Sequence, residues 1–304
     1  MNKLFSCLCL PVAAVVALTM SLPSRAAAVD WAKLNPELSG AVSVPGSSEC
    51  LECHEDYMRT YARTTHGRAL PDGGCESCHG PMSKHIDAPR KEPPLAVTFK
   101  PEGGLTPAQK SSVCLQCHEG TKRTYWEGGP HAANDVTCDS CHYTMERRTS
   151  TGLAINEDAK TICLSCHLEK RGQLLKSSHM PVREGEMDCS GCHNPHGSYG
   201  PKLLKTATVN ETCYTCHAEK RGPFLWEHAP VRENCANCHD SHGSNNTGML
   251  KTKGPFLCLN CHQFGGHPNE PRYNRVSTNL AQGCVNCHNR IHGSNHPSGS
   301  KFAR

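Results

Sequence analysis

The chain has few of the residues from which a protein interior is normally built. Phe, Trp and Tyr make up 5% of its 304 residues, while it contains 26 glycines and 21 prolines. After residue 20 no apolar run approaches the roughly 18 residues that a membrane-spanning helix needs, and no ladder of alternating strands replaces it. A conventional side-chain core is therefore hard to assemble. We expect something other than side chains to fill the interior, and no direct contact of this chain with lipid.

The first residues have the three parts of an export signal. Lys3 precedes an apolar stretch that extends to Met20, and small residues follow at Ala26 and Ala28, as in an Ala-x-Ala cleavage site. We expect residues 1–28 to be a cleaved signal peptide, with a retained membrane anchor as the alternative. Cleavage after residue 28 would remove Cys7 and Cys9, two of the 22 cysteines.

The remaining twenty cysteines share one spacing. They form ten C-x-x-C pairs, each followed directly by histidine, and C-x-x-C-H is the attachment pattern of c-type haem. On one helical turn residues i and i+3 share a face and i+4 lies beside both, so two thiols can form thioethers while the histidine reaches iron. The cysteines are Cys50, Cys53, Cys75, Cys78, Cys114, Cys117, Cys138, Cys141, Cys163, Cys166, Cys189, Cys192, Cys213, Cys216, Cys235, Cys238, Cys258, Cys261, Cys284 and Cys287. The proximal histidines are His54, His79, His118, His142, His167, His193, His217, His239, His262 and His288.

Three other uses of paired cysteines fit less well. Zinc ribbons use C-x-x-C pairs but do not require histidine after every pair. A thioredoxin-like redox motif belongs to a βαβ context, which this sequence lacks. Disulfides suit an exported protein, yet ten identical two-residue gaps are not what loop stapling requires. The sequence thus predicts ten c-type haems.

Ten histidines lie outside the motifs, and their number equals the number of predicted haems. A single histidine of this kind is normally a surface or loop residue, but the equal count favours a second axial ligand for each iron. Two imidazoles saturate the iron, which argues against catalysis there. The distal candidates are His66, His85, His131, His179, His196, His228, His242, His267, His292 and His296.

The motifs recur in pairs that define a repeat. Pairs begin at Cys50, Cys114, Cys163, Cys213 and Cys258, so the unit is a two-haem block of about fifty residues. Most blocks carry one distal candidate 11 to 13 residues after the first proximal histidine and another shortly after the second motif.

The block that begins at Cys114 lacks the second candidate histidine, whereas the last block has a spare, His296. One long-range exchange would balance the count. Alternatively, Tyr143 or Met145, close to His142, is the exception to histidine ligation.

The reach of the chain restricts which iron a distal histidine can serve. Ligands on opposite faces of one iron hold their Cα atoms roughly 12 Å or more apart, while three residues span at most about 10 to 11 Å. His196 therefore cannot complete the haem held by His193, and His242 cannot complete that of His239. Each must cross to a different haem, which predicts a continuous stack of haems as the core and a largely unfolded apoprotein.

Three runs carry a resemblance to a known family: CYTCHAEKRGPFLWEHAPVRENCANCHDSHGS from residue 213, the later GMLKT, and the terminal CVNCHNRIHGSNHPSG. They closely resemble the decahaem cytochromes of the MtrA/MtoA/DmsE group, over essentially the whole chain after residue 28. The resemblance implies a bis-histidine decahaem rod of two pentahaem halves, threaded through an outer-membrane porin-like β-barrel. Such a rod carries electrons between periplasmic cytochromes and the cell exterior.

These arguments predict a multihaem cytochrome c of mostly irregular chain with short α-helices and little or no β-structure, elongated around its haems. The expected divisions are a lead over 29–49, a first pentahaem half over 50–167 and a second over 168–304. The expected function is electron relay, not enzymatic catalysis, in the periplasm at the outer membrane. Expected partners are the barrel, a periplasmic multihaem cytochrome and an outer-surface one, with no nucleic acid. A soluble periplasmic shuttle and a multihaem reductase are the alternatives.

Overall fold

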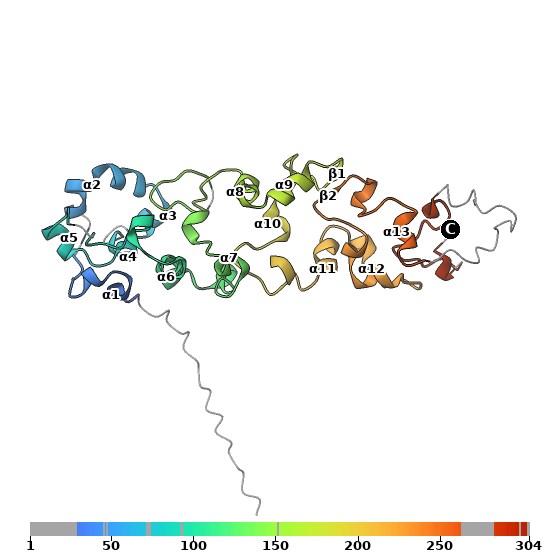
Figure 1. Ribbon diagram of the computed structural model, residues 1–304, viewed down its shortest axis with the longest axis horizontal. Coiled ribbons are helices and arrows are strands. Elements are labelled where there is room, and N and C mark those ends of the chain that lie inside the picture. Colours follow the sequence, from blue (N-terminus) through green and yellow to red (C-terminus); the bar gives the residue numbers. More distant parts are fainter. Residues whose placement is uncertain are drawn as a thin grey trace, which may run out of the picture.

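A computed structural model describes residues 29–44, 46, 48–70, 74–91, 94–150, 152–262, 283–297 and 299–302. The expected signal peptide and His267 lie outside the described residues. The chain forms an elongated rod along which the sequence advances from one end to the other (Figure 1). The first block lies at one end of the rod and residues 283–302 lie near the other.

Short helices account for most of the regular structure. The α-helices are α1 (Trp31–Leu34), α2 (Ser48–Tyr61), α3 (Thr65–Ala69), α4 (Glu76–His79), α5 (Ser83–Asp87), α6 (Pro107–His118), α7 (Pro130–Ala133), α8 (Ala159–Cys166), α9 (Leu168–Leu174), α10 (Cys189–Cys192), α11 (Val209–Tyr214), α12 (Ala229–Glu233) and α13 (Phe256–Leu259). The 3₁₀ turns are η1 (Pro36–Leu38), η2 (Pro101–Gly103), η3 (Thr121–Arg123), η4 (Cys138–Ser140), η5 (Pro201–Leu203), η6 (Ala218–Lys220), η7 (Cys235–Asn237), η8 (Thr247–Met249), η9 (Cys284–Asn286) and η10 (Gly299–Lys301).

Strand pairing is minimal in the part of the chain that the structure describes. Strand β1 (Ser178–His179) pairs antiparallel with β2 (Gly243–Ser244), and isolated bridges follow several motifs. The expected fold class is therefore confirmed: the rod consists of short helices, very little sheet and irregular connections. None of the described helices has the length and apolar character of a membrane span.

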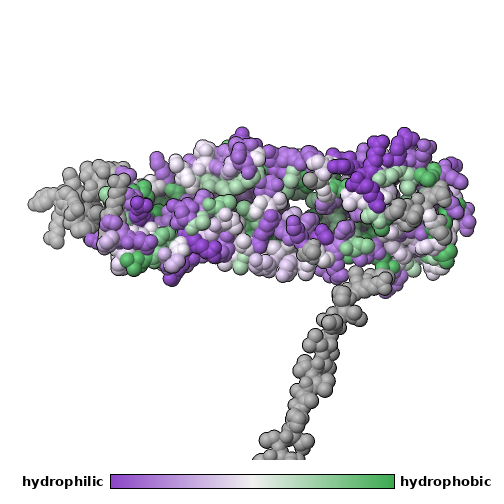
Figure 2. Space-filling view, turned by 180° about the vertical axis from the view of Figure 1, so that it is seen from behind, coloured by the Kyte–Doolittle hydropathy of each residue, from purple (hydrophilic) through white to green (hydrophobic). Residues whose placement is uncertain are grey.

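The interior contains few hydrophobic side chains. The buried ones among the described residues are Leu38, Tyr61, Met82, Leu95, Val97, Val113, Trp126, Leu174, Val182 and Leu204. Other large apolar side chains are exposed, including Leu51, Leu168 and Phe256, which lie within or close to attachment motifs. On the face shown in Figure 2, hydrophobic residues form separate patches among hydrophilic ones. The polypeptide alone thus leaves much apolar surface uncovered beside its motifs.

The lead over 29–49 is attached to the first block. Asn35 Nδ2 donates to the carbonyl oxygens of Pro94 and Ala96 at 2.9 and 3.2 Å. From the first block, Lys84 Nζ donates to the carbonyl oxygens of Glu37 and Ser39. The described part of the lead is therefore packed against the first block.

Candidate haem-attachment sites

Each C-x-x-C-H motif lies on a helical turn, as its spacing predicts. The backbone N–H of the motif histidine donates to the carbonyl of the first cysteine four residues earlier, for example from His193 to Cys189 at 3.0 Å and from His239 to Cys235 at 3.1 Å. Both thiols and the imidazole therefore extend from one turn.

N-terminal caps set where several of these turns begin. Thr106 forms a capping box with Gln109 at the start of α6, and the side chains of Asp158 and Asp188 cap α8 and α10. A cap of this kind stabilises a helix start by about 1 kcal/mol. Since these helices are short, the capping residue fixes the position of the motif that follows it.

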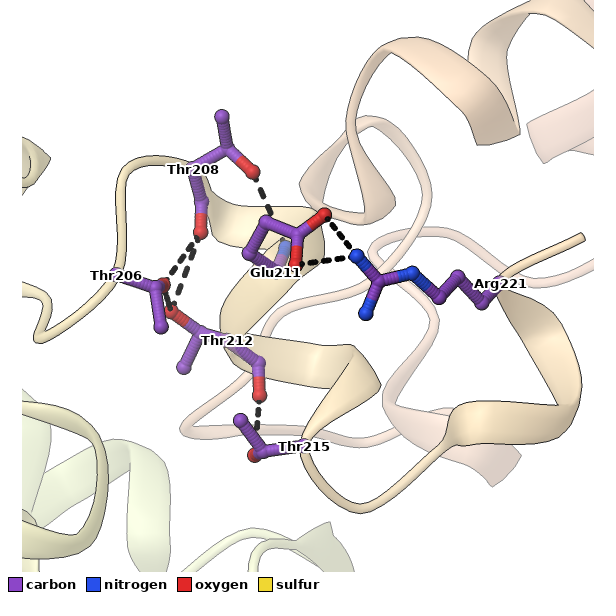
Figure 3. A network of polar contacts seen from close by, with 6 residues as sticks. All are labelled: Thr206, Thr208, Glu211, Thr212, Thr215 and Arg221. Atoms are coloured by element: carbon purple, nitrogen blue, oxygen red, sulfur yellow. Dashed lines mark hydrogen bonds and ion pairs between the residues drawn. The ribbon is translucent and has the colours of Figure 1, made fainter.

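Figure 3 shows the start of α11, which leads into the motif at Cys213. Thr208 Oγ1 accepts the N–H of Glu211 at 3.1 Å and caps the helix. The Glu211 carboxylate accepts from Arg221 Nη2 at 3.0 and 3.1 Å, so the residues after the motif are tied to the turn before it. Both side chains of this ion pair are substantially exposed, which limits its contribution to about 1 kcal/mol or less.

In each two-haem block, the histidine of the second motif has a fixed orientation. Its Nδ1–H donates to a backbone carbonyl oxygen further along the chain, from His79 to Val97, His142 to Gly152, His193 to Lys202, His239 to Gly248 and His288 to Lys301, at 2.5 to 2.9 Å. Such a bond selects the tautomer in which Nε2 is free to bind a metal. The C-x-x-C-H spacing does not reveal these acceptors, although the similar runs PKLLKT and GMLKT, which contain two of them, hint at a shared role.

Fourteen histidines are brought together in seven pairs, each of one motif histidine and one distal candidate. Ring centroids are 5.7 to 6.2 Å apart in His54–His85, His66–His118, His131–His167, His142–His196, His193–His242, His228–His262 and His239–His292. His196 thus lies beside His142 and not His193, and His242 lies beside His193 and not His239, in keeping with the reach of the chain.

The six pairs with centroids 5.9 to 6.2 Å apart fit an iron ion between the two rings, whereas the Nε2 atoms of His66 and His118 contact each other directly at 3.4 Å. A metal–imidazole bond is about 2.0 to 2.1 Å long, so two such ligands on opposite sides of one ion place their ring centroids about 6.3 Å apart. Burial lowers the pKa of several paired histidines, which keeps the ligand neutral as metal binding requires. These are His66, His85, His118, His196, His228, His242 and His292.

The remaining histidines differ from these pairs. His179 donates through Nδ1–H to the carbonyl of Lys176 and through Nε2–H to Glu184, and the hydrogen bond with Glu184 raises the pKa of His179. His217 Nδ1 lies 3.7 Å from the Glu219 carboxylate. The ring of His79 packs edge-on against Phe99, with centroids 5.9 Å apart. His267 lies outside the described residues.

The attachment cysteines follow one another along the rod. Within each block the first cysteines of the two motifs are neighbours, because the thiol of one perturbs the pKa of the other: Cys50 acts on Cys75, Cys138 on Cys114, Cys189 on Cys163, Cys235 on Cys213 and Cys284 on Cys258. Between blocks the second cysteines are also neighbours, because Cys117 raises the pKa of Cys78, Cys166 that of Cys141, Cys216 that of Cys192 and Cys261 that of Cys238. The ten motifs therefore form a single series in sequence order.

Glycines allow the loops that carry distal histidines to approach the neighbouring block. A Cβ atom on Gly197, which follows His196, would lie 2.0 Å from the carbonyl oxygen of Tyr125, and one on Gly243 would lie 2.3 Å from that of Gln173. Both glycines have positive φ, at +108° and +144°. Sequence reasoning missed their role, although the repeated His-Gly-Ser run was a visible signal.

Comparison with known proteins agrees with this arrangement. Residues 179–222 and 228–266 match the family described as "Doubled CXXCH motif", and residues 21–80 match "Cytochrome c554 and c-prime". The chain is 40% identical to the multihaem cytochrome MtrA of Shewanella baltica, with 100% of this chain and 98% of that protein aligned.

More distant similarity covers about half of the chain. It is 25% identical to the high-molecular-weight cytochrome c of Nitratidesulfovibrio vulgaris over 52% of this chain and 27% of that protein. It is 28% identical to the cytochrome c-type protein Cgr1 of Eggerthella lenta over 49% of this chain and 71% of that protein.

The fold, the motifs and these similarities define a multihaem c-type cytochrome, an electron carrier and not an enzyme. Within that class, the chain belongs to the MtrA family.

Proposed function

We propose that all ten C-x-x-C-H motifs carry haem and that the chain is an electron conduit across the outer membrane, held inside a porin-like β-barrel. The observation that carries the proposal is the single series of neighbouring motifs along the rod, with imidazole pairs at separations that suit iron. When bound, the haems supply reversible one-electron chemistry. The polypeptide contributes their spacing, axial ligation and surroundings.

In this proposal the cysteines of the motifs form the thioethers and the motif histidines are the proximal ligands. The distal ligands follow two rules. A histidine 11 to 13 residues after a first motif serves the first motif of the next block, as His131 lies beside His167 and His228 beside His262. A histidine shortly after a second motif serves the second motif one block upstream, as His196 lies beside His142. By the first rule we assign His179 to His217.

We further propose that 50–167 and 168–304 are two pentahaem halves joined by shared ligands. The ring centroids of His131 and His167 lie 6.2 Å apart and those of His142 and His196 lie 5.9 Å apart, which leaves room for an iron ion in each pair, and the second pair crosses the boundary. His131 Nδ1–H also donates to the carbonyl of Pro195 at 2.7 Å, which joins the two pairs. The row of haems would therefore continue without interruption between the halves.

The elongated shape and the family support the barrel (Figure 1). Inside such a sleeve, the barrel would face lipid while this chain extends from periplasmic carriers to extracellular acceptors or donors. Metal reduction and Fe(II) oxidation would use the same row of haems in opposite directions.

Purification and reconstitution test the proposal. We expect the tagged holoprotein to co-purify from detergent-extracted outer membranes in a defined complex with a porin-like protein. Liposomes that contain the complex should reoxidise a trapped reduced dye when an impermeant oxidant is added outside, whereas barrel alone should not. Purification as a lone soluble monomer, without transfer in liposomes, would establish the periplasmic shuttle instead.

A further inference from the structure

The motif that begins at Cys75 differs from the others in its surroundings. Its histidine, His79, packs against the ring of Phe99, and none of the histidine pairs formed by the described residues includes it. The second rule would supply its distal ligand from the loop after His142, one block downstream. That loop contains no histidine.

The expected long-range exchange with the end of the chain is wrong, because the ends of the rod are far apart. His79 ends α4 in the first block, whereas the segment 283–297, which contains His296, lies near the opposite end of the rod (Figure 1). His296 therefore cannot reach the iron held by His79.

The loop after His142 nevertheless has the same architecture as the loops that present distal histidines. In the loop after His193, Asn194 N donates to the carbonyl of Leu203 and Lys205 N to that of Cys192. Corresponding bonds close the loop after His239, from Asp240 N to Met249 and from Lys251 N to Cys238. In the loop after His142 they run from Tyr143 N to Leu153 and from Ile155 N to Cys141.

This shared scaffold defines a register. Three residues after the motif histidine, the loops carry His196 and His242, which lie beside the second-motif histidine one block upstream. At the same position the loop after His142 carries Met145. The second-motif histidine one block upstream is then His79.

The loop also docks on the corresponding upstream segment. Gly197 and Gly243 lie against Tyr125 and Gln173, seven and six residues after the first-motif histidines of the upstream blocks. Thr60, six residues after His54, donates through Oγ1 to the carbonyl of Met145 at 3.0 Å. Glu146 stands where the other loops have glycine, so here a hydrogen bond replaces the close backbone contact.

We propose that Met145 is the sixth ligand of the iron held by Cys75, Cys78 and His79, which makes this haem a His/Met centre in a chain otherwise ligated by imidazole pairs. Thioether ligation raises the reduction potential relative to two imidazoles. The second haem from the N-terminal end would therefore be the last to be oxidised. The inference rests on the proposed haem ligation and is independent of the barrel.

Other side chains near this site are less suitable. Tyr143 is engaged by Arg148, whose guanidinium carbon lies 3.7 Å from the ring centroid. Met82 follows His79 by three residues, and three residues span at most about 11 Å, too little to reach the opposite face of the same iron. Met58 Sδ lies 4.0 Å from Cys75 Sγ, one of the thiols that must bond to the porphyrin edge. Substitution of Met58, a second methionine close to the same motif, is therefore the matched control for substitution of Met145.

The test uses the ferric full-length holoprotein and near-infrared magnetic circular dichroism, in which thioether-ligated and bis-imidazole haems give separate charge-transfer bands. We expect a thioether band from one haem in the native protein. Met145→Leu should abolish it and produce one high-spin haem, while Met145→His should replace it with bis-imidazole signal and remove the highest-potential component of a redox titration. Met58→Leu should leave the band unchanged.

A native protein without the band, or a band that survives Met145→Leu, would overturn the assignment to Met145. Loss of the band in Met58→Leu alone would assign the ligand to Met58 instead. Haem content and the low-spin signal of the other haems are recorded on the same samples. A reduced haem content, or a reduced low-spin signal from the other haems, would count against the proposed ligation as a whole. Such a result is distinguishable from failure of the Met145 assignment alone.

Discussion

Replacement of Gly197 with alanine is expected to detach His196 from its place beside His142. The added Cβ would lie 2.0 Å from the carbonyl oxygen of Tyr125, whereas carbon–oxygen contacts in proteins are normally about 3.3 Å or longer. The loop would have to move by more than about 1 Å. A φ of +108° adds strain of about 1 to 3 kcal/mol for a residue with a side chain.

This displacement exceeds what an axial ligand tolerates, because functional ligand sets must be held within about 0.5 Å. We therefore expect Gly197→Ala to convert one haem from low-spin to high-spin ferric iron, measured by electron paramagnetic resonance against total haem. His196→Ala, which removes the imidazole without backbone strain, should give the same spectrum. Gly172→Ala is the control, because a Cβ there meets no atom within 4 Å.

The reasoning would be refuted if Gly197→Ala kept full haem content and an entirely low-spin spectrum. In that case either the loop shifts without moving His196, or the imidazole is not the ligand. His196→Ala separates these outcomes, because a low-spin spectrum in that variant as well would exclude His196 as a ligand.

Three further predictions follow from the same structure. His242→Ala should produce one high-spin haem, at the site of His193 and not at that of His239. Addition of His193→Ala should then remove the remaining histidine ligand of the same haem and create no second high-spin centre. Chain produced without haem attachment should show little helix by far-ultraviolet circular dichroism and rapid proteolysis, since its interior holds few hydrophobic side chains. Arg221→Ala should lower the free energy of unfolding by at most about 1 kcal/mol, measured by denaturant titration at constant haem content, because its pair with Glu211 is exposed.

Much of the fold was predictable because it depends on local spacing. The C-x-x-C-H pattern predicts a helical turn at every motif, and the scarcity of apolar residues predicts a rod without a large side-chain core. The reach of the chain also predicts that His196 and His242 lie beside histidines other than those of their own motifs. These arguments use distances along the chain, which the sequence contains.

The identity of each partner histidine was not predictable, because it depends on how successive blocks dock. A loop such as that after His193 could face upstream or downstream by sequence alone. The contacts of Gly197 with Tyr125 and of Gly243 with Gln173 show that these loops face upstream. The long-range exchange was expected only because histidines were counted without regard to their positions along the rod.

The two ligand rules work in opposite directions along the chain, and this explains how a repeat without a large core holds together. His131 reaches forward to His167, while His196 reaches back to His142, so in the proposed ligation two ligands cross between successive blocks. By the proposed rules a block would depend on its neighbours for axial ligands, as in other repeat proteins whose units are stable only beside neighbours. No C-x-x-C-H motif lies in residues 29–49, and His85 pairs with His54 inside the first block.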